Sequence, residues 1–366
     1  MPKTKCLLVG STEVYGGKSA TIIGIAHQLQ QKGVEIGYGK PLGTYPSQSL
    51  DRNLTGTSEE DVRFMAGALH LSERHRKAPI LCLDELTIRK QLQNGQRQDN
   101  TKLLDTYVSN IAGDLILLEG PSTLSEGQLF DLSLNQMAEQ LDSSVLLVAR
   151  YHSLELLDRL LAAKISLGDR LLGVLISDIP EEDWQGVETE IQPFLERQNI
   201  EVFGRLPRNN LLRSVSVREL AKKLKAKILC REDRLDLMVE TLTIGAMNVN
   251  SALEYFRKGK NMAVVTGGDR SELQLAALET STNCLILTGH APPQDFVLTR
   301  AEDLEIPILS VDLDTLTTVE IADRAFGQVR LQEAIKVDCI RDLMQQHFDI
   351  DRLMKALVLE PATVEV

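Results

Sequence analysis

A lysine and a hydroxyl residue follow a pair of glycines near the start of the chain, a combination that can bind phosphate. The segment reads GSTEVYGGKSA over residues 10–20. Glycines let backbone N–H groups converge on phosphate oxygens, and the N-terminus of a following helix adds a favourable dipole. In this interpretation Lys18 reaches the β- and γ-phosphates and the Ser19 hydroxyl holds Mg²⁺. The candidate cofactor-binding residues are Gly10, Thr12, Glu13, Gly16, Gly17, Lys18, Ser19 and Ala20.

The spacing of this phosphate loop departs from the usual pattern. That pattern has a glycine where this chain has Thr12, and the glycine here stands at Gly10. The alternative interpretation is a glycine-rich turn between a strand and a helix, with an incidental lysine.

The elements around the loop repeat along the first half of the chain. Apolar runs without polar alternation alternate with segments of helical periodicity, which is typical of a parallel sheet covered on both faces. We therefore predict an α/β fold of the P-loop NTPase type, with a mainly parallel sheet and helices on both faces. The predicted strands are 5–10, 34–40, 115–119, 144–149, 171–177 and 201–203.

With a second strand that ends in Lys40-Pro41, the first part of the chain resembles dethiobiotin synthetase and its relatives. The resemblance implies that Lys40 supplies positive charge at the reacting phosphate and carboxylate, and that Asp61, in EEDVRF, binds Mg²⁺. Glu119 ends the apolar run LILLE, where a carboxylate beside the phosphate loop can also hold Mg²⁺. The plainer alternatives are a solvated lysine at a strand end and an acidic residue that suits a helix dipole.

Two departures from this family bear on substrate and base. The family has Glu-Gly-Ala-Gly-Gly after the apolar run, whereas this chain has Pro121, Ser122 and Thr123 after Glu119-Gly120. We therefore predict that the protein does not make dethiobiotin. Asp178 stands near the place of the base-recognising asparagine of the family, so purine specificity by that route has no support.

The second half resembles a DRTGG domain through the stretches VVTGGDR at 264–270 and LILTG at 285–289. We predict strands at 262–266, 285–288 and 308–311, helices at 231–247 and 271–279, and two amphipathic helices in the tail 331–357. Asp269 and Arg270 either bind a polar effector or pair with each other. The predicted domains are 1–215, a dethiobiotin-synthetase-like nucleotide-binding domain, and 216–366, a DRTGG domain with C-terminal helices.

The two halves together resemble the N-terminal portion of long-form bacterial phosphotransacetylases, without the transacetylase domain. That resemblance implies an ATP- and Mg²⁺-binding regulatory or sensor protein that does not transfer acetyl groups. We also expect a homo-oligomer whose size or shape changes with nucleotide. Either the oligomer itself or a partner protein would respond to that change. The alternatives are an ATP-dependent carboxylate-activating ligase of the dethiobiotin synthetase type and a structural scaffold with a relic phosphate loop.

Composition narrows the class of protein further. The 366 residues carry a net charge of −12, which argues against nucleic acid as the main partner. No apolar run approaches the length of a membrane span. The five cysteines are scattered and odd in number, which favours the reducing cytoplasm over a disulfide framework.

Overall fold

The computed structural model describes residues 5–44, 57–94, 100–289, 291–327, 331 and 333–359. It divides into two compact units, unit 1 with residues Met1–Arg208 and Leu331–Val366, and unit 2 with Asn209–Arg330. Each unit is described by itself. Among the described residues, no helix is both long enough and apolar enough to cross a membrane.

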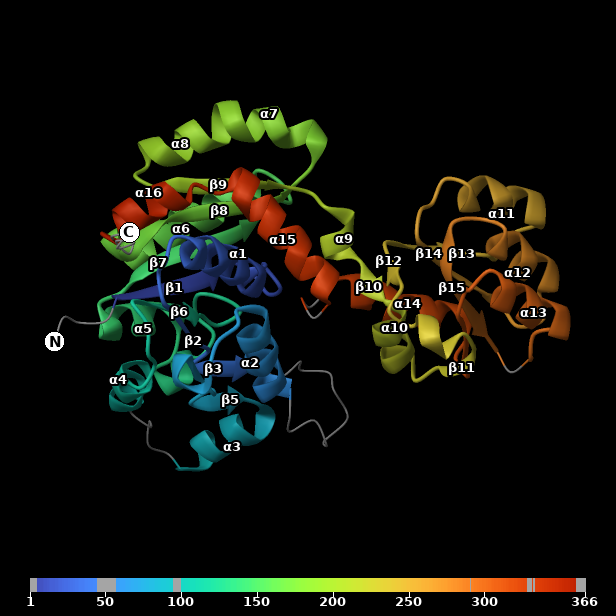
Figure 1. Ribbon diagram of the computed structural model, residues 1–366, viewed down its shortest axis with the longest axis horizontal. Coiled ribbons are helices and arrows are strands. Elements are labelled where there is room, and N and C mark those ends of the chain that lie inside the picture. Colours follow the sequence, from blue (N-terminus) through green and yellow to red (C-terminus); the bar gives the residue numbers. More distant parts are fainter. Residues whose placement is uncertain are drawn as a thin grey trace. The chain divides into compact units, whose positions relative to one another are not determined.

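Unit 1 is built on a parallel sheet of seven strands in the order β4-β2-β6-β1-β7-β8-β9 (Figure 1). All neighbouring strands in it run parallel. The central strands are almost entirely buried because both faces are covered, which explains their uninterrupted apolar sequences. The strands are β1 (Lys5–Ser11), β2 (Ile36–Gly39), β4 (Arg76–Lys77), β6 (Leu115–Glu119), β7 (Ser144–Arg150), β8 (Leu171–Ile179) and β9 (Val202–Pro207). The predicted α/β class with a mainly parallel sheet is confirmed.

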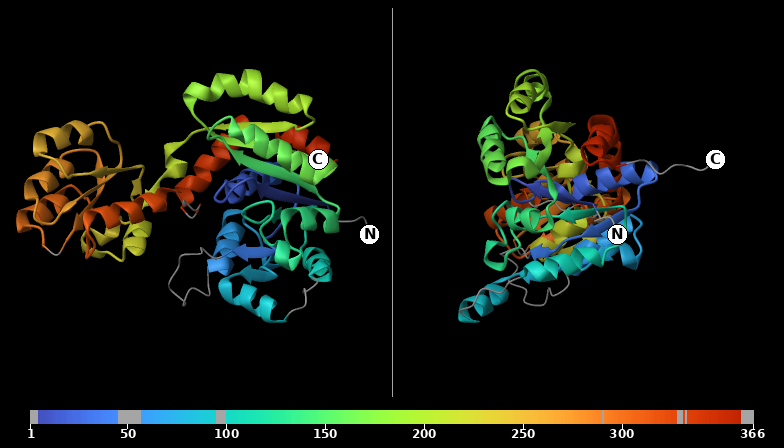
Figure 2. Two further views of the ribbon diagram at one scale, coloured as in Figure 1. Left: turned by 180° about the vertical axis from the view of Figure 1, so that it is seen from behind. Right: turned by 90° about the vertical axis from the view of Figure 1, so that its left-hand side faces the viewer.

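Helices lie on both sides of this sheet, as the edge-on view in Figure 2 shows. One core forms between the sheet and the helices α4 (Thr101–Ser109), α5 (Leu134–Leu141), α6 (Glu155–Leu167) and α8 (Gln192–Arg197). On the other side α1 (Lys18–Gln31) packs against β1 and β6, and α2 (Thr57–Ala68) contacts α1. The carboxyl ends of the strands therefore share one edge, where the phosphate loop lies.

The C-terminal helices α15 (Ala334–His347) and α16 (Ile350–Ala356) belong to unit 1, which corrects their predicted place in the second domain. Helix α15 lies against α1 (Figure 1), and the Gln28 side chain donates to the carbonyl of Met344 at 3.1 Å. Phe348 forms an antiparallel bridge with Gly204 of β9. The amphipathic pattern predicted the helices, but it could not tell which unit their apolar face would cover.

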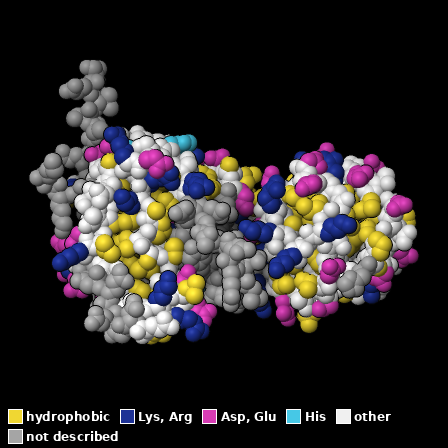
Figure 3. All heavy atoms as spheres, turned by 90° about the horizontal axis from the view of Figure 1, so that it is seen from below, with side chains coloured by type: hydrophobic (Ala, Val, Ile, Leu, Met, Phe, Trp, Pro, Cys, Tyr) yellow, Lys and Arg dark blue, Asp and Glu magenta, His cyan; other side chains and the backbone are white. Residues whose placement is uncertain are grey.

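A small parallel pair, β3 (Leu42–Thr44) with β5 (Leu81–Leu83), lies beside α3 (Glu85–Asn94). Helix α3 leaves Leu86 and Leu92 exposed. Figure 3 shows apolar side chains gathered on this side of unit 1.

Unit 2 contains a five-stranded sheet in the order β11-β16-β15-β14-β13, parallel except at β11. Helices α11 (Val249–Phe256), α12 (Ser271–Leu278) and α13 (Asp295–Asp303) cover one face, and α10 (Val217–Leu224) and α14 (Thr315–Gly327) cover the other. The strands are β11 (Lys227–Cys230), β13 (Thr241–Ile244), β14 (Met262–Gly267), β15 (Thr282–Thr288) and β16 (Ile308–Val311). The predicted helix at 231–247 is wrong, because that segment contains β12 (Met238–Val239) and β13.

Candidate functional site

The phosphate loop leaves β1 and turns directly into α1, the context that the sequence predicted. Gly17 precedes the helix with φ of 94°, a left-handed conformation that favours glycine. At Gly16 a Cβ atom would lie 1.9 Å from the Ser11 Oγ, so only glycine fits there. The loop is held by the Ser11 hydroxyl, which donates to the Glu13 carbonyl at 2.8 Å, and by the Thr12 N–H, which donates to Val148 of β7. Gly10 precedes this turn in β1.

Lys18, Ser19 and Ala20 form the first turn of α1, so their backbone N–H groups lie at its positive end. The Lys18 side chain is only 9 % exposed. Burial lowers its pKa, and the carboxylate of Glu119 opposes that effect. Because burial outweighs this attraction, an anion bound at the helix N-terminus would stabilise the Lys18 ammonium further, which is the electrostatic condition for phosphate binding.

Glu119, at the end of β6, is the centre of the site. Its Oε2 accepts hydrogen bonds from the Ser19 hydroxyl at 3.1 Å and from the Tyr38 hydroxyl at 3.0 Å. Its Oε1 lies 3.2 Å from the Lys40 Nζ. Burial disfavours the charged carboxylate, but Lys40, Lys18 and the hydrogen bonds outweigh it and lower the pKa of Glu119. Glu119 is therefore ionised although it is only 4 % exposed.

Lys40 joins the carboxylates of two elements. Its Nζ lies 3.3 Å from Asp61 Oδ2 of α2 as well as 3.2 Å from Glu119. Burial favours the neutral amine, yet the two carboxylates prevail and raise the pKa of Lys40. The interpretation of Lys40 as a solvated lysine at a strand end is wrong, because the residue is 8 % exposed and doubly paired.

The oxygens gathered here fit a hard divalent cation. Ser19, Glu119 and Asp61 offer one hydroxyl and two carboxylates. Mg²⁺ in nucleotide sites commonly binds through one or two carboxylates, with water and phosphate oxygens completing the shell. In the described parts of the chain, no group of three or more His, Cys, Asp or Glu side chains could hold a metal on its own. The donor set thus fits a cation shared with a phosphate ligand.

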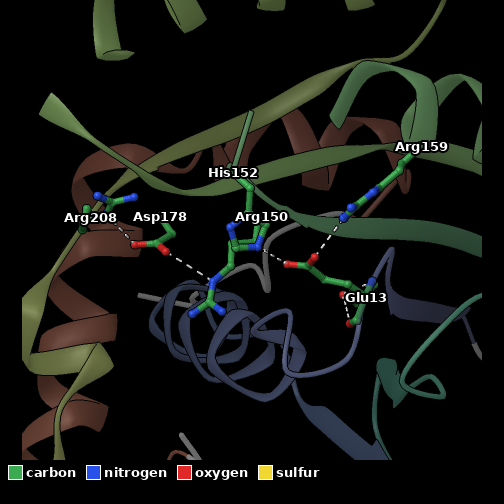
Figure 4. A network of polar contacts seen from close by, with 7 residues as sticks. Glu13, Arg150, His152, Arg159, Asp178 and Arg208 are labelled. Carbon is green, nitrogen blue, oxygen red and sulfur yellow. Dashed lines mark hydrogen bonds and ion pairs between the residues drawn. The ribbon is translucent and has the colours of Figure 1, made fainter. Parts of the chain in front are cut away.

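The Glu13 side chain has partners that the sequence did not indicate. Its carboxylate contacts His152 Nε2 at 3.0 Å and Arg159 Nη1 at 2.9 Å, from the β7–α6 connection and from α6 (Figure 4). Thus the carboxylate ties the phosphate loop to its neighbours.

Tyr38 is one residue of this site that the sequence analysis did not predict. Burial and the neighbouring Glu119 raise its pKa well above the ordinary value, so its hydroxyl remains a donor. A signal was present, since Tyr38 stands two positions before Lys40 and alternate residues of a strand share a face. Glu126 is a second missed residue, because its charge acts on the pKa of Lys18.

Asp269 and Arg270 of unit 2 follow β14 and are both exposed. Within the described residues no hydrogen bond or ion pair joins them, so the structure does not show the pairing that the sequence left open. The turn before them is held by Gln274, whose side-chain nitrogen donates to the carbonyls of Gly267 at 2.8 Å and Gly268 at 3.0 Å.

Known proteins resemble the chain over nearly its whole length. The phosphate acetyltransferase of Nitratidesulfovibrio vulgaris is 23 % identical over 96 % of this chain and 51 % of its own length. That of Synechocystis sp. is 24 % identical over 97 % of this chain and 52 % of its own length. The chain thus spans about half the length of these curated relatives.

One solved structure, the CBS and DRTGG domains of the regulatory region of Clostridium perfringens pyrophosphatase, bound to the activator diadenosine tetraphosphate, aligns with 35 % of this chain and 65 % of its own. The identity is 17 % and the TM-score 0.27, too low to support an inference.

Two family models match successive parts of the chain. A DRTGG domain matches residues 219–325, and an AAA domain matches residues 5–216. Together with the phosphate acetyltransferase relatives, these matches confirm the resemblance to the N-terminal portion of long-form phosphotransacetylases. Since the AAA match covers more than half of its residues, the chain belongs to the AAA domain family.

Proposed function

We propose that unit 1 binds ATP together with Mg²⁺ at the phosphate loop. The observation that carries this proposal is the buried Lys18 at the N-terminus of α1, next to a serine that hydrogen-bonds an ionised carboxylate. A nucleoside triphosphate supplies the negative charge that Lys18 lacks and the phosphate oxygens that a cation at Ser19 needs. ATP is the nucleotide that the family resemblance implies.

In the proposed complex Gly10, Thr12, Glu13, Gly16, Gly17 and Ala20 shape the loop around the phosphates, and Ser19, Asp61 and Glu119 hold the cation. When bound, Mg²⁺ neutralises phosphate charge and fixes the orientation of the phosphates. Lys40 then lies between the two carboxylates and faces the γ-phosphate.

The proposed role is regulatory. The chain resembles the portion of phosphotransacetylases that precedes the transacetylase domain, and we assign no acetyl transfer to it. We propose that it forms a homo-oligomer whose state responds to nucleotide, with Asp269 and Arg270 near the effector-responsive surface. A partner protein that recognises the nucleotide-bound form is the other way in which such a change could act.

A ligase is the second candidate, because of Lys40. A buried lysine beside the metal-side carboxylates is suited to the charge that develops when a carboxylate or carbamate attacks the γ-phosphate. Pro121, Ser122 and Thr123 in place of the family's glycines argue against dethiobiotin formation itself.

Calorimetric titration with ATP, GTP, CTP and UTP, each with and without Mg²⁺, tests nucleotide binding directly. Phosphate release in the presence of small carboxylic acids separates the two candidates. Binding without acid-stimulated turnover supports the sensor, acid-stimulated turnover supports the ligase, and no binding would contradict both. Light scattering with and without ATP–Mg²⁺ tests the expected oligomer, and a monomer indifferent to nucleotide would refute the sensor role.

A further inference from the structure

Two carboxylates at the carboxyl edge of the large sheet are each held between two basic side chains (Figure 4). Glu13 lies between His152 and Arg159, and Asp178 lies between Arg150 and Arg208. The proposed function assigns no role to these basic residues. Through the short segment from Arg150 to His152, the two sets of contacts form one chain of ion pairs.

Its first end is the phosphate loop. The Glu13 carboxylate, 20 % exposed, contacts His152 at 3.0 Å and Arg159 at 2.9 Å. Phosphates bound at the loop would bring negative charge near Glu13 and compete with its carboxylate for Arg159 and for the N–H of His152. A bound triphosphate would therefore have different interaction energies with two states of the protein, one in which Glu13 keeps these two contacts and one in which it has lost them. Such a difference is required for a ligand to shift the equilibrium between two states.

The middle is a short backbone segment, Arg150 to His152. Arg150 is the last residue of β7, and the N–H of Tyr151 donates to the carbonyl of Ser177 at 2.8 Å. This hydrogen bond ties the segment that carries His152 to β8, immediately before Asp178.

Within this chain of ion pairs, Asp178 has an unusual backbone conformation. It has φ of 60°, a left-handed conformation that costs free energy for a residue with a side chain. The pairing of β8 with β9 is irregular between Ile176 and Ile179, on either side of it. Its carboxylate, 11 % exposed, lies 3.3 Å from Arg150 and 3.3 Å from Arg208. The two arginines thus hold an irregular backbone in place.

The far end is Arg208, the last residue of the first segment of unit 1. The N–H of Arg208 donates to the carbonyl of Ile179 at 2.7 Å, directly after β9. The next residue, Asn209, begins unit 2 and caps α9 (Asn210–Arg213) by accepting from the N–H groups of Leu211 and Leu212. The chain of ion pairs therefore runs from the phosphate loop to the first of the two places where the polypeptide passes between the units.

We propose that these contacts couple nucleotide occupancy of the phosphate loop to the first residues of the DRTGG unit, through Glu13, the segment 150–152, Asp178 and Arg208. The inference rests on the proposed nucleotide binding and specifies its regulation. In this proposal Asp178 and Arg208 act as positioning residues for the junction.

Hydrogen exchange of the full chain, with and without ATP–Mg²⁺, tests the coupling. In the wild type the nucleotide should change exchange of the amides in 209–224 by about fivefold or more, as for ordinary allosteric coupling. Arg150→Gln and Arg208→Gln each remove one of the two partners of Asp178 and should each abolish most of this change, while ATP affinity stays near that of the wild type.

Arg205→Gln is the matched control, because Arg205 lies on β9, three residues before Arg208, and pairs at 2.7 Å with Glu188, outside the chain of contacts. The nucleotide effect should persist in it. An effect that survives in both test variants, or is equally lost in the control, would overturn the route. Binding without any change beyond residue 208 would also overturn it, whereas absence of binding by the wild type would refute the proposed function instead.

Discussion

Replacing Lys40 by methionine should strongly destabilise unit 1. Lys40 is the positive partner of Glu119 at 3.2 Å and Asp61 at 3.3 Å, and its side chain is 11 % exposed. Removing one partner of a buried ion pair leaves an uncompensated charge and costs about 3–5 kcal/mol. For a domain of this size that is a fall in melting temperature of roughly 6–20 °C. Calorimetric melting and urea unfolding, both without nucleotide, measure the loss.

The matched control is Lys32→Met, since Lys32 pairs at 2.8 Å with Asp351, whose side chain is 79 % exposed. Such a surface pair contributes about 0–1 kcal/mol. The double variant Lys40→Met/Glu119→Gln should lose less than the sum of the single changes, because the second change removes the unpaired charge. If Lys40→Met were as mild as Lys32→Met, the reasoning about the buried cluster would be refuted.

The same cluster fixes the pH range in which the pair stabilises the fold. The pKa of Glu119 is lowered from its ordinary 4.5, so its contribution is present above that value and is lost as the pH falls through the folded-state pKa. The pKa of Lys40 is raised from 10.5, so its contribution persists up to that value and is lost as the pH rises through the folded-state pKa. The stability difference between wild type and Lys40→Met should therefore be constant near neutrality and shrink on acidification.

Three further predictions concern packing, protons and metal. Gly24→Ala would place a Cβ 2.2 Å from Met344 Cγ, so we expect a loss of about 1–3 kcal/mol in urea unfolding that Met344→Ala relieves; an unchanged midpoint would contradict the tight contact of α1 with α15. Burial lowers the pKa of Lys18 and bound phosphate should raise it, so ATP binding at alkaline pH should take up protons; calorimetric heats independent of the buffer would disagree. Asp61→Asn should weaken the Mg²⁺-dependent part of ATP affinity by about tenfold, measured by fluorescent-nucleotide titration, and leave Mg²⁺-free binding unchanged. Equal losses with and without Mg²⁺ would remove Asp61 from the cation site.

The sequence predicted the elements whose apolar pattern is complete. Leu115–Glu119 is buried on both faces, so it reads as an uninterrupted apolar run and places Glu119 at the strand end. By contrast β13 is the short segment TLTI, which is partly exposed and has no long apolar run, so the sequence pattern around it wrongly predicts a helix. The local sequence pattern therefore predicts fully buried elements well and partly exposed elements poorly.

Within the site, the sequence indicated which residues carry charge but not their partners. The contacts of Glu119 with Ser19 and Lys40 join residues far apart in the chain, and only the strand order brings them together. The contact of Glu13 with Arg159 likewise depends on β7 lying next to β1. Such partners depend on the order of the strands in the sheet, which the spacing of residues within one element does not reveal.

The most direct test of the central claim is a calorimetric titration of ATP–Mg²⁺ into the wild type, Lys18→Ala and the control Lys32→Ala. A charge-assisted contact with phosphate is typically worth about 1.5–3 kcal/mol, so Lys18→Ala should bind at least about tenfold more weakly. Because Lys18 is buried with a lowered pKa, the substitution should not reduce the melting temperature of the free protein. Lys32 lies at the far end of α1, and Lys32→Ala should bind as the wild type does. Unchanged affinity in Lys18→Ala, or no binding by the wild type, would contradict the account.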